Sequence, residues 1–174
     1  EKLTAEMFAA MKDATGVGGA EVGTVVNTHA NGDHTYGNGL AVNANIIASK
    51  ASAHEIAEEA PPEMLAGMMK AADQFGLAGE FFKAKFGDFH FDGIKMRQPT
   101  ETFTGTMEVK VGNKTAKLIE VGPAHTAGDT LVHVPEDKVV YTGDILFIDG
   151  TPIAWAGPVS NWIKACDLIC AMDV

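Results

Sequence analysis

The chain has 174 residues and a mass of 18.3 kDa, a size that fits one domain and is too small for two. Hydrophobic residues make up 46% of the sequence and charged residues 21%, the balance of a globular rather than a disordered protein. The formal net charge of −10 gives a surface that repels nucleic-acid phosphates and anionic lipid headgroups. We therefore expect a single domain over residues 1–174 that binds neither nucleic acid nor a membrane.

No targeting or membrane-spanning segment is visible in the sequence. No stretch approaches the roughly 20 apolar residues of a transmembrane helix, and the chain opens at Glu1 without the basic and apolar regions of a signal peptide. We therefore expect a cytoplasmic location. Cys166 and Cys170 are too few for a disulfide framework, and their spacing predicts a reduced, buried pair on one face of a helix.

The first half of the chain predicts helices and two strands. Thr4 is expected to cap the first helix, and β-branched residues then predict a strand that ends in an irregular loop rich in Asn and Gly. Ser52 and Glu55 have the spacing of a capping box and predict another helix start. The predicted elements are helix 4–14, strand 21–28, strand 45–48, helix 52–61 and a helical stretch over 62–87.

From Thr104 onward the apolar residues recur at every second position, the pattern of strands with one buried face. Gly112 and Asn113 predict a hairpin turn between two such runs. Ser160 is expected to cap the last helix. The predicted elements are strands 106–111, 115–121, 130–134 and 138–142, followed by helix 160–171, which together make an α/β chain whose sheets are mainly hairpins.

Side chains of the kind that bind metal ions follow three of these strands. In layered α/β folds, ligands bind where loops converge at the carboxyl ends of strands. Imidazoles combined with carboxylates are the ligand set of Zn²⁺ or Fe²⁺. We therefore expect a metal site formed by His29, Asp33, His34, His125 and Asp144.

The three segments that carry these residues resemble the metallo-β-lactamase superfamily of metal-dependent hydrolases. They read THANGDHTYGN, GPAHTAGDTLVHVP and VVYTGDILF. The resemblance implies an α/β (α+β) fold, an αββα sandwich with metal ions held at one edge between the sheets, here with a helical insertion over about 53–91. It also implies that His29 and His125 bind a first ion, that Asp33 and His34 bind a second, and that Asp144 bridges both.

Two positions depart from the pattern of the family. Asn31 stands where a second histidine is usual, and an amide oxygen is a poorer ligand for a borderline-soft cation. No histidine follows His133, so the last histidine of the family has no counterpart. The resemblance implies one or two Zn²⁺ ions, with Fe or Mn as alternatives, and we expect Asn31 and Asp129 to act as a weak ligand or as support for the ligands.

The domain is expected to be shortened at both ends. Only 28 residues precede His29, whereas the family opens with a pair of strands. A shortened sandwich would leave strand edges unpaired and apolar surface uncovered. A second copy of the chain is the simplest partner that could cover these edges and this surface, so we expect a homo-oligomer.

The resemblance implies hydrolysis of a small-molecule substrate by a metal-bound hydroxide, with Asp33 as the catalytic residue that helps to hold the hydroxide. The expected substrate is a small ester, lactone, thioester or amide. A truncated, catalytically impaired domain that binds metal or self-associates is an alternative, and a non-haem iron oxidoreductase is another. Trp155 is a possible contact of the substrate or of an interface.

Overall fold

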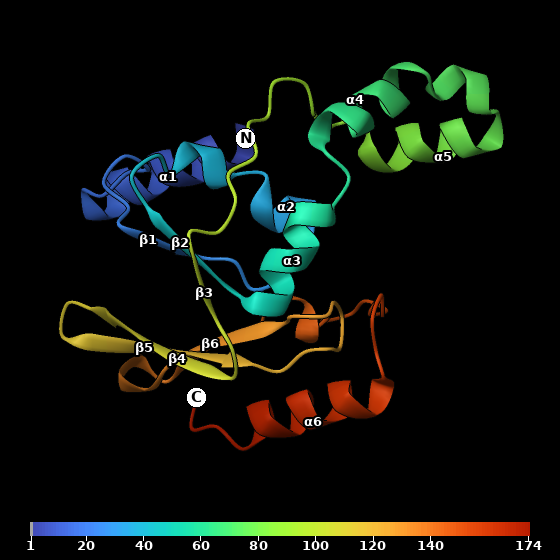
Figure 1. Ribbon diagram of the computed structural model, residues 1–174. Helices are drawn as coiled ribbons and strands as arrows, with labels where there is room; N and C mark the ends of the chain where they lie inside the picture. The colour runs from blue at the N-terminus through green and yellow to red at the C-terminus, as the bar shows by residue number, and fades with distance from the viewer. Residues whose placement is uncertain (1) are drawn as a thin grey trace.

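Two β-sheets lie face to face at the centre of the computed structural model, which describes residues 2–174 (Figure 1). The first sheet is parallel and has the order β1-β2-β3, and the second is antiparallel and has the order β4-β5-β6-β7. Helices cover both outer faces, so the predicted αββα sandwich is confirmed. The strands are β1 (Thr24–Val26), β2 (Asn45–Ser49), β3 (Glu101–Phe103), β4 (Thr106–Val111), β5 (Lys114–Glu120), β6 (Thr130–Val134) and β7 (Val139–Tyr141).

The two-residue repeat of the strands divides their apolar side chains between two cores. Leu118 of β5 is fully buried and packs against Ile47 and Phe103 of the parallel sheet. The next residue, Ile119, points the other way and packs with Leu131 beneath the last helix. The inner faces of the sheets therefore form one core, and the outer face of the antiparallel sheet forms another.

Helix α3 (Lys50–Glu58) covers the outer face of the parallel sheet, where Ile56 packs against Ala48. Helix α6 (Val159–Cys170) covers the antiparallel sheet. Trp162 anchors α6, because its ring is buried and its indole Nε1 donates a hydrogen bond to the Ile145 carbonyl oxygen at 2.8 Å. The remaining helices are α1 (Lys2–Thr15), α2 (Gly32–Thr35), α4 (Pro62–Lys70) and α5 (Leu77–Phe86), with short 3₁₀ turns η1 (Asn38–Leu40), η2 (Ala72–Phe75), η3 (Pro135–Asp137) and η4 (Gly143–Ile145).

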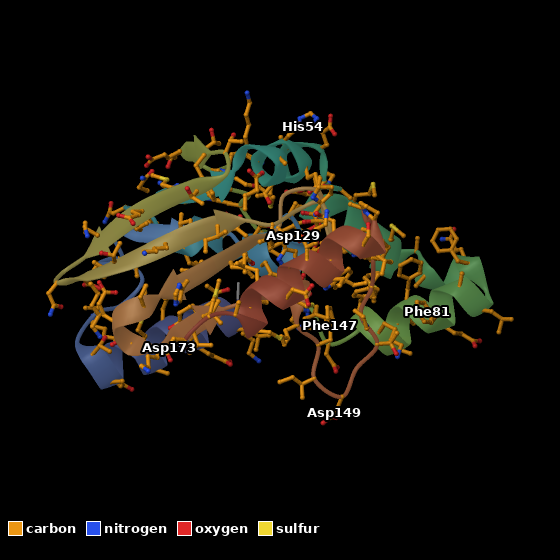
Figure 2. All side chains as sticks on the ribbon, turned by 90° about the horizontal axis from the view of Figure 1, so that it is seen from below. His54, Phe81, Asp129, Phe147, Asp149 and Asp173 are labelled. Carbon is orange, nitrogen blue, oxygen red and sulfur yellow. The ribbon has the colours of Figure 1, made fainter. Side chains whose placement is uncertain are left out.

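Helices α4 and α5 form an arm that extends away from the sandwich. Figure 2 shows Phe81 on this arm, at the opposite end of the molecule from Asp173. Leu77 at the start of α5 is 83% exposed. Within residues 2–174, no helix is both long and apolar enough to cross a bilayer.

Three predicted helix starts are wrong. Lys2 is already helical, so Thr4 lies inside α1. Ser49 rather than Ser52 caps α3, because its Oγ accepts a hydrogen bond from the Ser52 amide at 3.0 Å. Pro158 precedes α6, which places Ser160 inside the helix. In each case the helix begins earlier in the chain than predicted, by two or three residues, a difference that local sequence rules do not settle.

The parallel sheet is the larger departure from the predicted hairpins. Its third strand, Glu101–Phe103, has three residues and is too short to display a two-residue repeat. The strand predicted over 21–28 is reduced to Thr24–Val26. The buried cysteine pair is also corrected: both thiols are free, Cys166 is half-buried, but Cys170 is exposed.

Candidate metal centre

The five predicted ligands meet at one edge of the sandwich. His29 follows β1, and Asp33 and His34 lie in the short helix α2. His125 lies in the loop between β5 and β6, and Asp144 lies in η4 after β7. The ends of three strands thus bring together residues that are more than a hundred positions apart in the sequence.

His29, His125 and Asp144 form the inner part of the cluster. One ligand atom from each lies within 4.8 Å of the other two. The distances from Asp144 Oδ2 are 3.9 Å to His29 Nε2 and 3.6 Å to His125 Nε2. The two histidines are 1% and 3% exposed, whereas the Asp144 side chain is 28% exposed, so solvent reaches this half of the site only on the Asp144 side. This is a candidate metal-binding group.

Both imidazoles of this group turn their Nε2 toward Asp144, and that of His29 has no partner among the described residues. His29 Nε2 is buried and has no hydrogen-bond partner within residues 2–174, whereas its Nδ1 lies 3.0 Å from Thr28 Oγ1. His125 Nδ1 lies 2.6 Å from the Ile153 carbonyl oxygen. A carbonyl only accepts, so Nδ1 carries the proton and Nε2 offers its lone pair. Leaving such a nitrogen buried and unpaired costs about 1–3 kcal/mol, and a bound cation removes that cost. The residues present therefore fit a metal ion.

His34 and Asp33 form the outer part of the cluster. His34 Nε2 lies 3.3 Å from Asp33 Oδ2 and 3.4 Å from Asp144 Oδ1. The Asp33 side chain is 78% exposed and that of His34 is 32% exposed. Asp144 therefore faces the inner histidines with one oxygen and His34 with the other, as a carboxylate shared between two ions would.

The electrostatics keep His29 neutral. Burial, followed by the nearby imidazoles of His34 and His125, lowers the pKa of His29 to about 3, so its ring is uncharged at neutral pH as a metal ligand must be. In the outer half, the hydrogen bond between the two side chains raises the pKa of His34 and lowers the pKa of Asp33.

Asn31 adjoins the inner group at His125. Its Oδ1 is 2.8 Å from His125 Nε2, the nitrogen that carries the lone pair. Two acceptors do not bond to each other, so without a metal ion the amide is better placed with its NH₂ toward the ring. Asn31 is thus positioned to touch an ion bound by His125 or to occupy the lone pair of that histidine in its absence.

Asp129 supports His125 through the backbone rather than through the ring. It is 1% exposed, and its carboxylate accepts hydrogen bonds from the amides of Ala124 and Thr126 at 3.0–3.1 Å and from the Thr126 hydroxyl at 2.8 Å. Burial raises the pKa of this carboxyl. The Asp129 carboxylate therefore holds the loop that carries His125 in one conformation, through hydrogen bonds to residues of the same loop.

Two contacts of the imidazoles were not foreseen. The Thr28 hydroxyl adjoins His29, and it lies next to Gly143, whose φ of +51° and lack of a side chain allow this approach. The Ile153 partner of His125 is a main-chain oxygen, for which the sequence carries no signal. The same segment anchors Trp155, whose amide donates to the His125 carbonyl at 2.9 Å while its side chain is 67% exposed.

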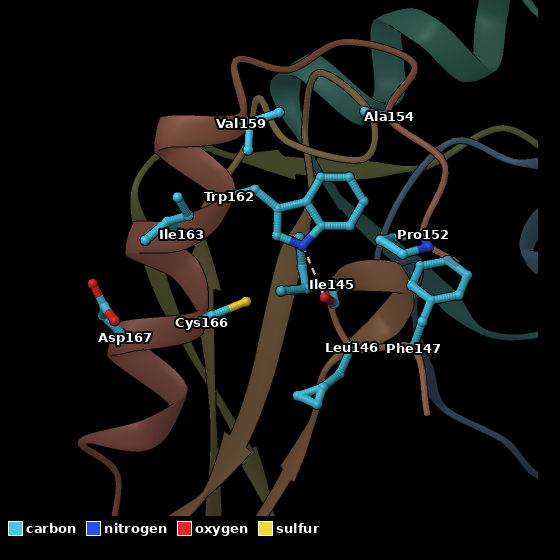
Figure 3. Close-up of a pocket in the computed structure, with 10 residues that line it drawn as sticks. All are labelled: Ile145, Leu146, Phe147, Pro152, Ala154, Val159, Trp162, Ile163, Cys166 and Asp167. Atoms are coloured by element: carbon cyan, nitrogen blue, oxygen red, sulfur yellow. Dashed lines mark hydrogen bonds between the residues drawn. The ribbon is translucent and has the colours of Figure 1, made fainter. Parts of the chain in front are cut away.

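An apolar cavity of about 550 Å³ lies between α6 and η4 (Figure 3). Phe147 and Trp162 line it, and the ring centroid of each is 6.0 Å from that of His125. The two aromatic rings therefore place an apolar surface beside His125.

Comparison with known proteins agrees with this geometry. The model of the metallo-beta-lactamase superfamily matches residues 3–171. The chain belongs to the metallo-beta-lactamase superfamily. This is a family of generally metal-dependent, hydrolase-like proteins. No curated protein matches the sequence.

Solved structures of the same fold are distant in sequence. A metallo-beta-lactamase from Pontibacter korlensis has a TM-score of 0.60 at 15% identity, over 94% of this chain and 61% of its own. Metallo-beta-lactamase IND-7 has a TM-score of 0.61 at 14% identity, over 98% of this chain and 64% of its own. The flavodiiron protein from Giardia intestinalis has a TM-score of 0.56 at 17% identity, over 99% of this chain and 40% of its own. The present chain thus spans about three fifths of the length of the first two structures.

Proposed function

We propose that this superfamily member is a metal-dependent hydrolase that acts on a small ester, lactone, thioester or amide. The observation that carries the proposal is the unpaired, buried Nε2 of His29, which faces Asp144 and His125. Zn²⁺ is the proposed ion because imidazole and carboxylate are its usual partners, and Fe or Mn suits the same donors. The number of ions proposed is one, held by the inner group, or two if Asp33 and His34 also bind.

A bound Zn²⁺ would supply a nucleophile at neutral pH by lowering the pKa of water from about 15.7 to about 7. The protein residues hold and orient the reactants. His29 and His125 offer neutral nitrogens that Thr28 and Ile153 keep in place. Asp33, which is open to solvent and has a lowered pKa, stays ionised and can accept a hydrogen bond from the attacking water.

Metal analysis combined with turnover tests the proposal. Protein purified without added ions is analysed for Zn, Fe and Mn and then assayed with chromogenic esters, thioesters, lactones and lactams. Bound metal with hydrolysis of one of these classes is the expected result. Metal-free protein that stays inert after Zn²⁺ is supplied would overturn the proposal.

An impaired, metal-binding domain is the second candidate, and Asn31 at the position of a usual ligand favours it. Such a domain would bind metal without turning over any substrate of the panel. Iron with redox activity and no hydrolysis would instead indicate the oxidoreductase alternative.

We also propose that the chain self-associates. Its accessible surface is 10148 Å², whereas a compact monomer of 18.3 kDa has about 8,100 Å². The difference exceeds the roughly 800 Å² that each partner of a stable dimer buries. The loop after η4, whose tip Figure 2 shows at Asp149, carries exposed apolar side chains, including Ile148 at 85%. Light scattering at micromolar concentration is expected to report a dimer or larger species, and a monomer would contradict the proposal.

A further inference from the structure

Helix α3 touches both loops that build the metal centre. At its start, the hydroxyls of Ser49 and Ser52 both donate to the Gly128 carbonyl, at 2.7 and 2.9 Å. Two residues beyond its end, the Tyr36 hydroxyl donates to the Ala60 carbonyl at 3.0 Å. Helix α3 and the residues that follow it therefore span the distance between the loop of His125 and the loop of His29 and Asp33.

Glu55 makes the contact that reaches closest to a proposed ligand. Its two carboxylate oxygens lie 3.1 and 3.0 Å from the Ala127 amide, and Ala127 is the second residue after His125. The carboxylate is partly buried, and burial raises the pKa of Glu55. If Glu55 served only to stabilise the helix, its carboxylate could remain in solvent and avoid the cost of desolvation.

The turn beside Glu55 has no room to shift. A Cβ added to Gly128 would lie 2.2 Å from the Ser52 amide nitrogen and 2.4 Å from Ser49 Oγ, so the turn and the start of α3 are in direct contact. Movement of α3 would therefore move the turn, and with it the backbone that carries His125.

We propose that Glu55 is a positioning residue of the metal centre, which fixes the turn after His125 through the Ala127 amide. This inference rests on the proposed metal site. Groups that orient metal ligands from outside typically change metal affinity by about 10–100-fold when removed. The hydrogen bond, rather than the charge, is the proposed cause, so a neutral acceptor of the same shape is expected to serve.

The test compares Zn²⁺ affinity in the wild-type chain and three variants. Glu55→Ala is expected to weaken binding about 10–100-fold, and Glu55→Gln is expected to restore it to within about threefold because its amide oxygen accepts from Ala127. Glu58→Ala is the matched control, since Glu58 lies on the same helix, is 69% exposed and contacts only His54 at 3.6 Å among the ion pairs of residues 2–174. The visible spectrum of the Co²⁺-loaded protein is expected to change in Glu55→Ala alone.

Wild-type affinity in Glu55→Ala would overturn the inference, and so would a Glu55→Gln variant as weak as Glu55→Ala. Hydrogen exchange of the Ala127 amide in the metal-free, folded protein separates this test from the proposed function. Exchange at least about tenfold faster in Glu55→Ala, with the unfolding midpoint of each variant as a check on folding, is the expected result. Unchanged exchange would overturn the positioning role, whereas wild-type protein that binds no Zn²⁺ would overturn the metal site itself.

Discussion

The metal centre has an inner half and an outer half that are built in different ways. In the inner half, His29 and His125 are 1% and 3% exposed, and a second contact holds each ring in place. In the outer half, Asp33 is 78% exposed and holds its position through one contact with His34. The inner half is therefore organised before any ion arrives, whereas the outer half gains order when it binds one.

Because of this difference, we expect the inner half to bind the metal ion tightly and the outer half to give water and substrate access to it. A buried group of neutral nitrogens and one carboxylate favours a firmly held ion, at the cost of unpaired polar atoms in the metal-free state. An exposed carboxylate binds more weakly but can meet water and substrate. We expect the two halves to respond differently to substitution, and the following variants test this expectation.

The largest effect is expected from Asp144→Ala, because the Asp144 carboxylate lies within 4 Å of both inner histidines and of His34. Zn²⁺ affinity is expected to fall by more than about 100-fold, beyond the range for residues that only support ligands, and hydrolysis is expected to disappear. Metal analysis after dialysis measures the first effect. Far-ultraviolet circular dichroism should stay unchanged, and an unaltered metal content would remove Asp144 from the site.

Gly128→Ala tests whether the turn after His125 is tightly packed against the start of α3. The added methyl would overlap the start of α3, so the free energy of unfolding is expected to fall by about 1–3 kcal/mol. Gly67 of α4 is the matched control, since nothing lies within 4 Å of an added Cβ there. Gly67→Ala is expected to stabilise the chain by about 0.5–1 kcal/mol. Urea unfolding measures both, and equal effects would show that the turn is not confined.

The buried His29 predicts a pH dependence of the metal-free protein. Its folded-state pKa of about 3 lies below the ordinary 6.5, so between these values the unfolded chain binds more protons. The free energy of unfolding therefore falls as the pH falls, by up to about 1.4 kcal/mol per pH unit from this group. His29→Gln lacks this contribution, and urea unfolding between pH 6 and pH 5 should show a shallower profile for the variant. Parallel profiles would contradict the burial of a neutral imidazole.

The smallest effect on metal binding is expected in the outer half. Asp33→Asn removes a charge that is mostly in solvent, so the affinity for the first Zn²⁺ ion is expected to change less than about tenfold. Turnover is expected to fall by about 10²-fold or more, because the side chain proposed to orient water is altered. Titration calorimetry and steady-state kinetics on the same preparation measure the two effects. Loss of the first ion would mean that the halves are not distinct.

The sequence predicted which side chains meet, because all of the proposed ligands lie in the segments that follow three strands, and strand ends converge at one edge of a layered fold. Strand Thr130–Val134 was predicted to the residue, since its apolar pattern is set by two buried faces. The role of α3 was not predictable. Its contacts with residues 127 and 128 join positions more than 70 apart in the sequence, and only the packed fold defines them.

Contacts made by main-chain atoms also could not be predicted from the sequence. Nothing in the identity of Ile153 indicates that its carbonyl orients His125, because every residue offers the same oxygen. At Ser49 and Ser52 the side chains do carry a signal, but the sequence does not say which of the two caps the helix. Both can cap a helix, and both hydroxyls donate to the Gly128 carbonyl, a contact that the sequence does not show.

Equilibrium dialysis of the metal-free chain against Zn²⁺, with the bound metal counted by mass spectrometry, tests the inner group most directly. At least one ion per chain is expected in the wild-type protein, kept in His34→Ala and lost in His125→Ala. An equal count in the wild-type and His125→Ala proteins, or no bound ion in either, would contradict the account.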